Sequence, residues 1–190
     1  MIQTNILQDN VEVELYAIDQ LRELIPGWED LPTAERLERL EAVDPVHEFS
    51  SHNVITQTYR EHLRDLIDPE SATQTAIDVT HMAFGDDGTA PSPSDTHLVN
   101  EVYRDQIDDH VAVGDDEVYK GTLLIGSDDA VGLDLIEAAL VSESDPGNAD
   151  DMAANRVILD DPDARLQPKD SDHAVTVRIE LSYLDESEVA

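Results

Sequence analysis

The sequence predicts an α+β protein in which a helical N-terminal region is followed by a mainly antiparallel, β-sandwich-like domain. Apolar residues recur at three- and four-residue spacing up to about residue 68, and they alternate with polar residues from about residue 76. The chain has 190 residues, enough for one substantial core or for a small helical piece beside a second domain. We therefore expect a helical attachment and oligomerisation region at 1–70 and a mainly-β domain at 71–190.

Three short amphipathic helices are expected in the first region. The first carries apolar residues over 15–25 and ends at Pro26-Gly27, and the second runs from Pro32 to Pro45. The third begins at a cap residue, Ser50 or Ser51, and continues to about residue 66. Their apolar stripes must be buried, and the residues expected to contact partner chains are Leu15, Ile18, Leu21, Ile55, Tyr59 and Leu63.

Strands are expected in the second region. The clearest is 175–183, where apolar and polar residues alternate strictly. Weaker candidates are 76–84, 102–113, 118–126, 131–141 and 154–160, and Gly114-Asp115-Asp116 predicts a hairpin turn between two of them. A short helix containing Leu98 and Val99, capped by Ser94 or Asp95, is expected in the loop after the first of these strands.

The charge excludes several function classes. There are 11 Lys and Arg residues against 44 Asp and Glu residues, so the formal net charge is −33. Such a surface repels phosphate backbones and anionic lipids, and we therefore expect no nucleic-acid or membrane partner. The acidic residues are interspersed with periodic apolar ones, which favours a folded chain over disorder. Only two lysines occur, and the composition resembles that of haloarchaeal proteins, whose surface repulsion is screened by molar salt.

Motifs for catalysis or metal binding are missing from the sequence. The chain has no cysteine, and His47 and His52 lie five apart rather than at the four-residue spacing of the zinc-protease helix. The acidic loops lack the ligand pattern of an EF-hand. Nucleophile elbows, phosphate loops and dinucleotide-binding glycines are also absent. We expect a protein that is not an enzyme and that has no cofactor and no metal.

Four segments carry a resemblance to a known family. The run from Thr80 to Gly88 (THMAFGDDG), followed by Leu98 to Arg104 (LVNEVYR), resembles the N-terminal region of phage tail-collar fibre proteins. Gly132 to Glu137 (GLDLIE) is similar to that family's glycine-led strand, and Asn53-Val54-Ile55-Thr56 resembles its first helix. The residues carried over as fold motif are Gly85, Gly88, Asn100, Glu101, Arg104, Gly132 and Glu137.

These residues also have a physical interpretation that needs no family. Gly85 and Gly88 permit a tight loop, and Glu101 and Arg104 are spaced to form an ion pair that supports the fold. The resemblance implies a virion structural protein of a haloarchaeal tailed virus, placed in the tail as a fibre, collar or baseplate component and assembled in the host cytoplasm. It implies other virion proteins as partners and a homo-oligomer, a trimer. The alternatives are a capsid decoration or turret protein, and an acidic haloarchaeal enzyme or cation-binding protein.

Overall fold

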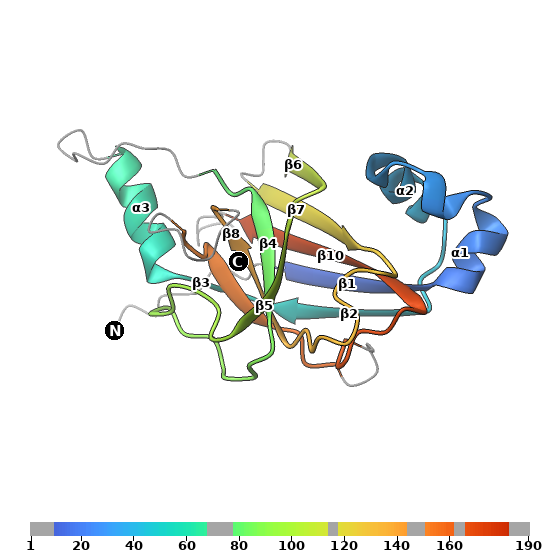
Figure 1. The fold of residues 1–190 in the computed structure, drawn as a ribbon. Coiled ribbons are helices and arrows are strands. Elements are labelled where there is room, and N and C mark those ends of the chain that lie inside the picture. The colour runs from blue at the N-terminus through green and yellow to red at the C-terminus, as the bar shows by residue number, and fades with distance from the viewer. Residues whose placement is uncertain (1–9, 68–77, 114–117, 144–150, 162–165, 183–190) are drawn as a thin grey trace, which may run out of the picture.

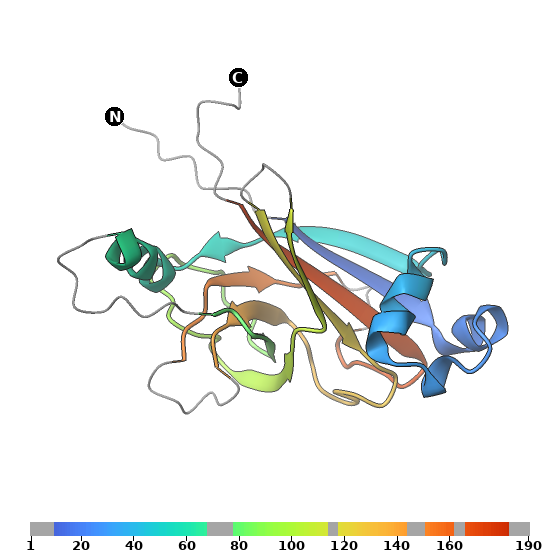
Figure 2. The ribbon, with the colours of Figure 1, turned by 90° about the horizontal axis from the view of Figure 1, so that it is seen from above.

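The described part of the chain forms two five-stranded antiparallel sheets and three α-helices (Figure 1). The computed structural model describes residues 10–67, 78–113, 118–143, 151–161 and 166–182. Sheet A has the strand order β2 (His47–His52), β1 (Asn10–Ala17), β10 (His173–Ser182), β7 (Val118–Ile125) and β6 (Asp109–Val113). Sheet B has the order β3 (Val54–Ile55), β9 (Asn155–Ile158), β8 (Glu137–Val141), β4 (His81–Gly85) and β5 (Glu101–Gln106). The two sheets form separate layers (Figure 2), which confirms the predicted α+β, sandwich-like fold.

The first 70 residues contribute strands as well as helices. The helix expected from residue 15 is wrong at its start, because residues up to Ala17 form β1 and α1 covers only Ile18–Leu24. In β1, Val11, Val13 and Leu15 alternate toward the interior, and the helical spacing begins only after them. Strand β1 lies between β2 and β10, so the N-terminal region shares a sheet with the C-terminal strand.

Of the remaining expected helices, one lies within its predicted span, one begins later than predicted and one does not form. α2 (Thr33–Leu40) falls inside the predicted span, and a 3₁₀ turn at Trp28–Asp30 precedes it. The helix expected to start at Ser50 or Ser51 instead begins at Gln57 (α3, Gln57–Ile67), because residues 47–52 form the edge strand β2. Strand β2 carries few apolar residues, so its sequence lacks the alternation that marks a strand. No helix forms at Leu98 and Val99, since residues 94–99 follow an irregular path.

The expected strands of the second region lie close to the observed ones. Strands β4, β7, β8, β9 and β10 each fall within or overlap a predicted range, and 102–113 divides into β5 and β6. The hairpin at Gly114-Asp115-Asp116 lies outside the described residues, although β6 and β7 on either side of it pair antiparallel.

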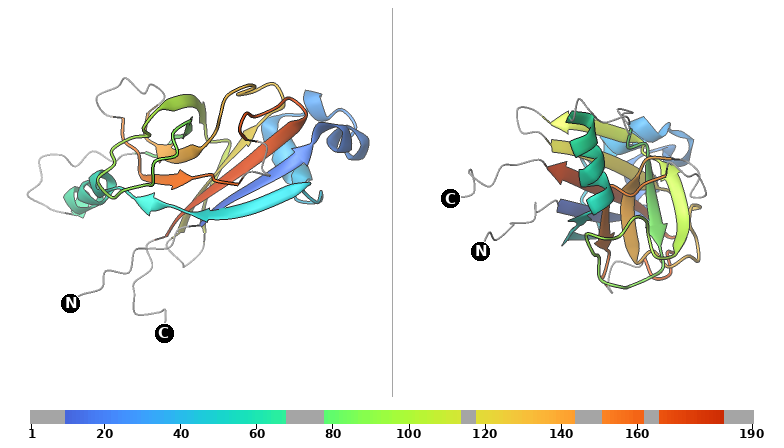
Figure 3. Two further views of the ribbon diagram at one scale, coloured as in Figure 1. Left: turned by 90° about the horizontal axis from the view of Figure 1, so that it is seen from below. Right: turned by 90° about the vertical axis from the view of Figure 1, so that its left-hand side faces the viewer.

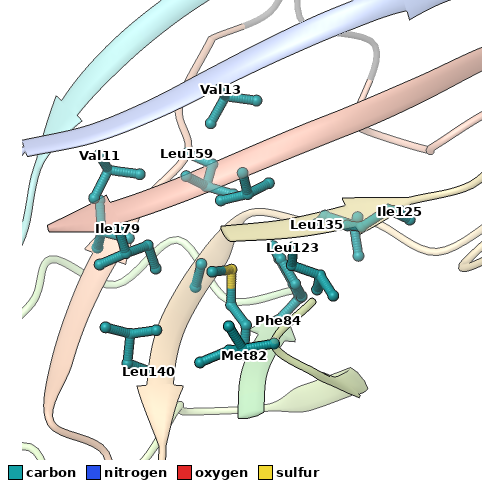
Figure 4. Packing of buried hydrophobic residues seen from close by; sticks show 14 of the residues in the cluster. Val11, Val13, Met82, Phe84, Leu123, Ile125, Leu135, Leu140, Leu159 and Ile179 are labelled. Carbon is teal, nitrogen blue, oxygen red and sulfur yellow. The ribbon is translucent and has the colours of Figure 1, made fainter. Parts of the chain in front are cut away.

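The main core lies between the sheets (Figure 4). Val13, Phe84, Leu123 and Ile179 are among its side chains with at most 1% exposure. A second cluster covers the outer face of sheet A, where Tyr16, Leu124 and Ala174 meet the residues of α1, the 3₁₀ turn and α2. These helices lie at the opposite end of the molecule from α3 (Figures 1 and 3).

Two stretches of chain pass directly from one sheet to the other. Strand β2 continues into β3 through Asn53, which is 3% exposed. Strand β5 continues into β6 through Ile107 and Asp108, and the Asp108 carboxylate accepts a hydrogen bond from the Leu124 amide at 2.8 Å. Because β2 and β6 are the edges of sheet A, and β3 and β5 those of sheet B, the sandwich is linked by continuous chain along both edges.

Candidate functional site

The loop between β4 and β5, residues 86–100, is held by buried charges. It leaves β4 at Gly85, where an added Cβ would overlap the Glu137 carboxylate and would lie 2.6 Å from the carbonyl oxygen of Asn100. Only glycine therefore lets the two ends of the loop approach Glu137 this closely. The loop ends are also joined directly, since the Asn100 side-chain amide donates to Asp86 at 2.6 Å.

Glu137 receives the end of the loop. Its side chain is 0% exposed, and one carboxylate oxygen accepts hydrogen bonds from the backbone amides of Val99 at 3.0 Å and Asn100 at 3.2 Å. The other oxygen accepts from Arg156 Nε at 2.5 Å. A buried carboxylate without such donors would be strongly destabilising, so these three hydrogen bonds make its burial tolerable.

Arg156 connects Glu137 to the middle of the loop. It is 1% exposed, and its two terminal nitrogens donate to Asp95 at 2.8 Å and to the carbonyl oxygen of Thr89 at 2.7 Å. Burial alone would lower the pKa of Arg156, but the hydrogen bonds to Asp95 and Glu137 outweigh it and the pKa is raised. We call Glu137, Arg156 and Asp95 the loop anchor.

A second arginine fixes the start of β5. Arg104 makes paired hydrogen bonds to Glu101, both at 2.7 Å, which confirms the ion pair expected from their spacing. It also forms a two-point contact with the buried Asp151, at 3.0 and 2.8 Å, and donates to the carbonyl oxygen of Glu143. Burial would lower the pKa of Arg104, but the bonds to the two carboxylates outweigh it and the pKa is raised.

Sequence reasoning found part of this arrangement. Gly85, Asn100 and Glu137 meet at the loop anchor, and Glu101 and Arg104 form the neighbouring pair. Gly88 lies in the same loop, with Ile136 as the nearest side chain to an added Cβ, at 3.7 Å. Gly132 lies apart from both ion pairs; it adopts a φ of 81° and its amide donates to the carbonyl oxygen of Lys169.

The two central partners, Arg156 and Asp151, were missed. Asp151 follows a polar loop in the sequence and carries no signal of its own. Arg156, in contrast, is the single charged residue in the stretch from Met152 to Leu159. A lone arginine in a buried strand requires a buried carboxylate partner, so this signal was available in the sequence.

Five of the six residues expected to contact partner chains are buried within this chain, and Leu63 is partly buried. Leu15, Ile55 and Tyr59 lie in the main core, and Leu63 packs against it. Ile18 and Leu21 belong to the second cluster, where they are 3% and 0% exposed. The idea that these stripes remain free for an interface is therefore wrong, because the two sheets offer enough apolar surface to bury them within one chain.

Every side-chain nitrogen of Arg104 and of Arg156 donates a hydrogen bond to a carboxylate or a backbone carbonyl oxygen of this chain. Among the described residues, no group of three or more His, Asp or Glu side chains is placed to hold a metal ion. In that same part of the chain, no helix is both long and apolar enough to cross a membrane. The arrangement ties the loop between β4 and β5 to Glu137 of β8 and Arg156 of β9.

Comparisons with protein-family models, with curated proteins and with solved structures found no match to this chain.

Proposed function

We propose that the protein is a virion structural module of a haloarchaeal tailed virus, placed in the tail as a fibre, collar or baseplate component. One observation carries this proposal: the residues on which the resemblance to tail-collar fibre proteins rests act as fold elements. Gly85, Asn100 and Glu137 fix the loop at the anchor, and Glu101 and Arg104 fix the strand that follows it. A motif used to hold a shape suits a protein that acts through surface complementarity.

The acidic composition of the chain is consistent with a module that works in concentrated salt. With 44 acidic residues and 11 basic ones, the chain repels itself strongly at low ionic strength. At 1 M salt the Debye length falls to about 3 Å, so this repulsion is screened. The protein is therefore suited to particles that assemble and persist in concentrated salt, with other virion proteins and further copies of itself as partners.

The experiment that tests the proposal is quantitative mass spectrometry of virus particles purified in high salt from the host that carries this gene. A few to a few tens of copies per particle, together with antibody labelling at the tail, is the expected result. Hundreds of copies would instead assign the protein to the capsid, as a decoration or turret protein. Its absence from the particles, together with its presence in uninfected cells, would overturn the virion role and favour a cellular protein.

A further inference from the structure

Strand β5 forms an edge of sheet B, and among the described residues it pairs with β4 alone (Figure 3). At its end the amide of Ile107 donates to the carbonyl oxygen of Thr80 at 3.0 Å, and the same register continues back through Asp105. Successive residues of an antiparallel strand direct their backbone groups to opposite sides. The backbone N–H and C=O groups of Arg104 and Gln106 therefore point away from β4. We call this side of β5 the open edge.

Solvent reaches the backbone of the open edge. Arg104 is partly exposed as a residue, yet its side chain is only 6% exposed, so the exposed part is its backbone. Gln106 is exposed, and its amide donates to the neighbouring Asp105 carboxylate at 2.7 Å rather than to another strand. Main-chain donors and acceptors that face solvent along a strand edge can pair with an extended segment of another chain.

The open edge borders a group of carboxylates at the rim between the two sheets. Asp105 is opposite Met82 of the main core, so its side chain lies on the inner side of sheet B. Burial raises the pKa of Asp108, in the crossing to β6, and the negative charges of Asp105 and Asp129 raise it further. The charge of Arg36 opposes this increase, but its guanidinium donates to two backbone carbonyl oxygens. A strand added beside β5 would therefore meet an excess of negative charge.

We propose that the open edge of β5 binds an extended segment of a partner protein, which continues the antiparallel sheet and carries lysine or arginine opposite Asp105. Side chains directly opposite on paired strands have Cβ atoms about 4.5–5.5 Å apart, so strand pairing itself brings the partner's cation against Asp105. Such contact is required in concentrated salt, because at 1 M the Debye length is about 3 Å and more distant attractions are screened. A second copy of this chain suits the edge poorly, since it has 44 acidic residues and 11 basic ones. The inference deepens the proposed virion function, on which it rests for the partner being another virion protein.

The probe is a labelled peptide of about eight residues in which lysine and threonine alternate. Its binding to the full-length protein is followed by fluorescence anisotropy in about 1 M KCl, where non-specific attraction to an acidic chain is screened. One control peptide has glutamate in place of lysine. Another is N-methylated at every threonine, because with lysine opposite Asp105 the threonine amides would face Arg104 and Gln106.

Three protein variants accompany the peptides. Asp105→Lys reverses the charge beside the open edge, and Glu48→Lys makes the same change at an exposed position of β2, an edge strand of the other sheet. Gln106→Pro places a proline ring on the open edge without removing a bond to β4, because the Gln106 amide points away from that strand. Circular dichroism in the same buffer establishes that each variant is folded.

The lysine peptide is expected to bind the wild type at a single site. Its dissociation constant should rise at least about tenfold with Asp105→Lys, with Gln106→Pro and on N-methylation, and stay within about twofold with Glu48→Lys. No binding of the lysine peptide, or equal binding of the glutamate peptide, would overturn the proposal. Dimerisation of the protein alone that Gln106→Pro abolishes would overturn it too and assign the edge to a second copy. None of these results touches the virion role, which the particle analysis decides separately.

Discussion

Removing the buried cation of the loop anchor should destabilise the protein far more than removing an exposed one. Arg156→Met keeps most of the side-chain volume but leaves Glu137, at 0% exposure, without its charged partner. Breaking a buried ion pair from one side typically costs about 3–5 kcal/mol. The two backbone amides that still donate to Glu137 place the expected loss near the lower end of this range, at about 3 kcal/mol.

The measurement is urea unfolding followed by circular dichroism in about 3 M KCl, with a thermal melt as a second readout. For a chain of this size, each kcal/mol lowers Tm by about 2–4 °C, so the melt should shift by roughly 6–12 °C. Arg39→Met is the control, because Arg39 and Glu35 are 55% and 41% exposed and such a pair contributes only about 0.3–0.5 kcal/mol. If Arg156→Met cost less than about 1 kcal/mol, or no more than the control, the anchor would not be an energetic centre of the fold.

Three further predictions concern other parts of the molecule. Gly85→Ala should lower the free energy of unfolding by about 1–3 kcal/mol, because its Cβ would overlap groups that hold the loop, whereas Gly88→Ala should change it by less than about 0.5 kcal/mol; equal effects in urea unfolding would refute the close approach. Leu40→Ala, in the cluster that contains the only tryptophan, should cost about 2–5 kcal/mol and shift tryptophan fluorescence to longer wavelength on partial exposure of the ring. Burial lowers the pKa of Lys169 below its ordinary 10.5, so between the lowered value and 10.5 the unfolded chain binds more protons than the folded one. The unfolding free energy of the wild type, relative to that of Lys169→Met, should therefore rise as pH increases toward 10.5. A difference between the two unfolding free energies that does not change with pH would contradict the lowered pKa of a buried Lys169.

The sequence predicted the fold class because its three- and four-residue spacing occurs in helices of the structure and its two-residue alternation occurs in strands. Apolar and polar residues alternate strictly along β10, and Val177 and Ile179 face the main core. Strand β7 pairs with β10 in a continuous antiparallel register. The same reasoning failed at β1, where the alternation of Val11, Val13 and Leu15 runs directly into the helical spacing of α1. When a strand and a helix meet without a turn residue between them, the apolar positions of both merge into one apparent pattern.

Spacing in the sequence predicted a specific ion pair of the candidate site only where the two residues are close in the chain. Glu101 and Arg104 are three apart, so their pairing follows from spacing. The contact between Glu137 and Arg156 depends on the antiparallel pairing of β8 with β9, and the contact of Arg156 with Asp95 depends on the path of a long loop. Such contacts are set by tertiary packing, which no local pattern in the sequence records.

Strands β1 and β10 lie side by side at the centre of sheet A, with Val13 opposite Val177, although they stand near opposite ends of the described chain. During synthesis, the edge of β1 that pairs with β10 therefore stays unpaired until β10 has left the ribosome. Folding that depends on so distant a contact is slow, and an unpaired strand edge invites association between nascent chains. The dense carboxylates oppose such association only where the ionic strength is low enough to leave their repulsion unscreened.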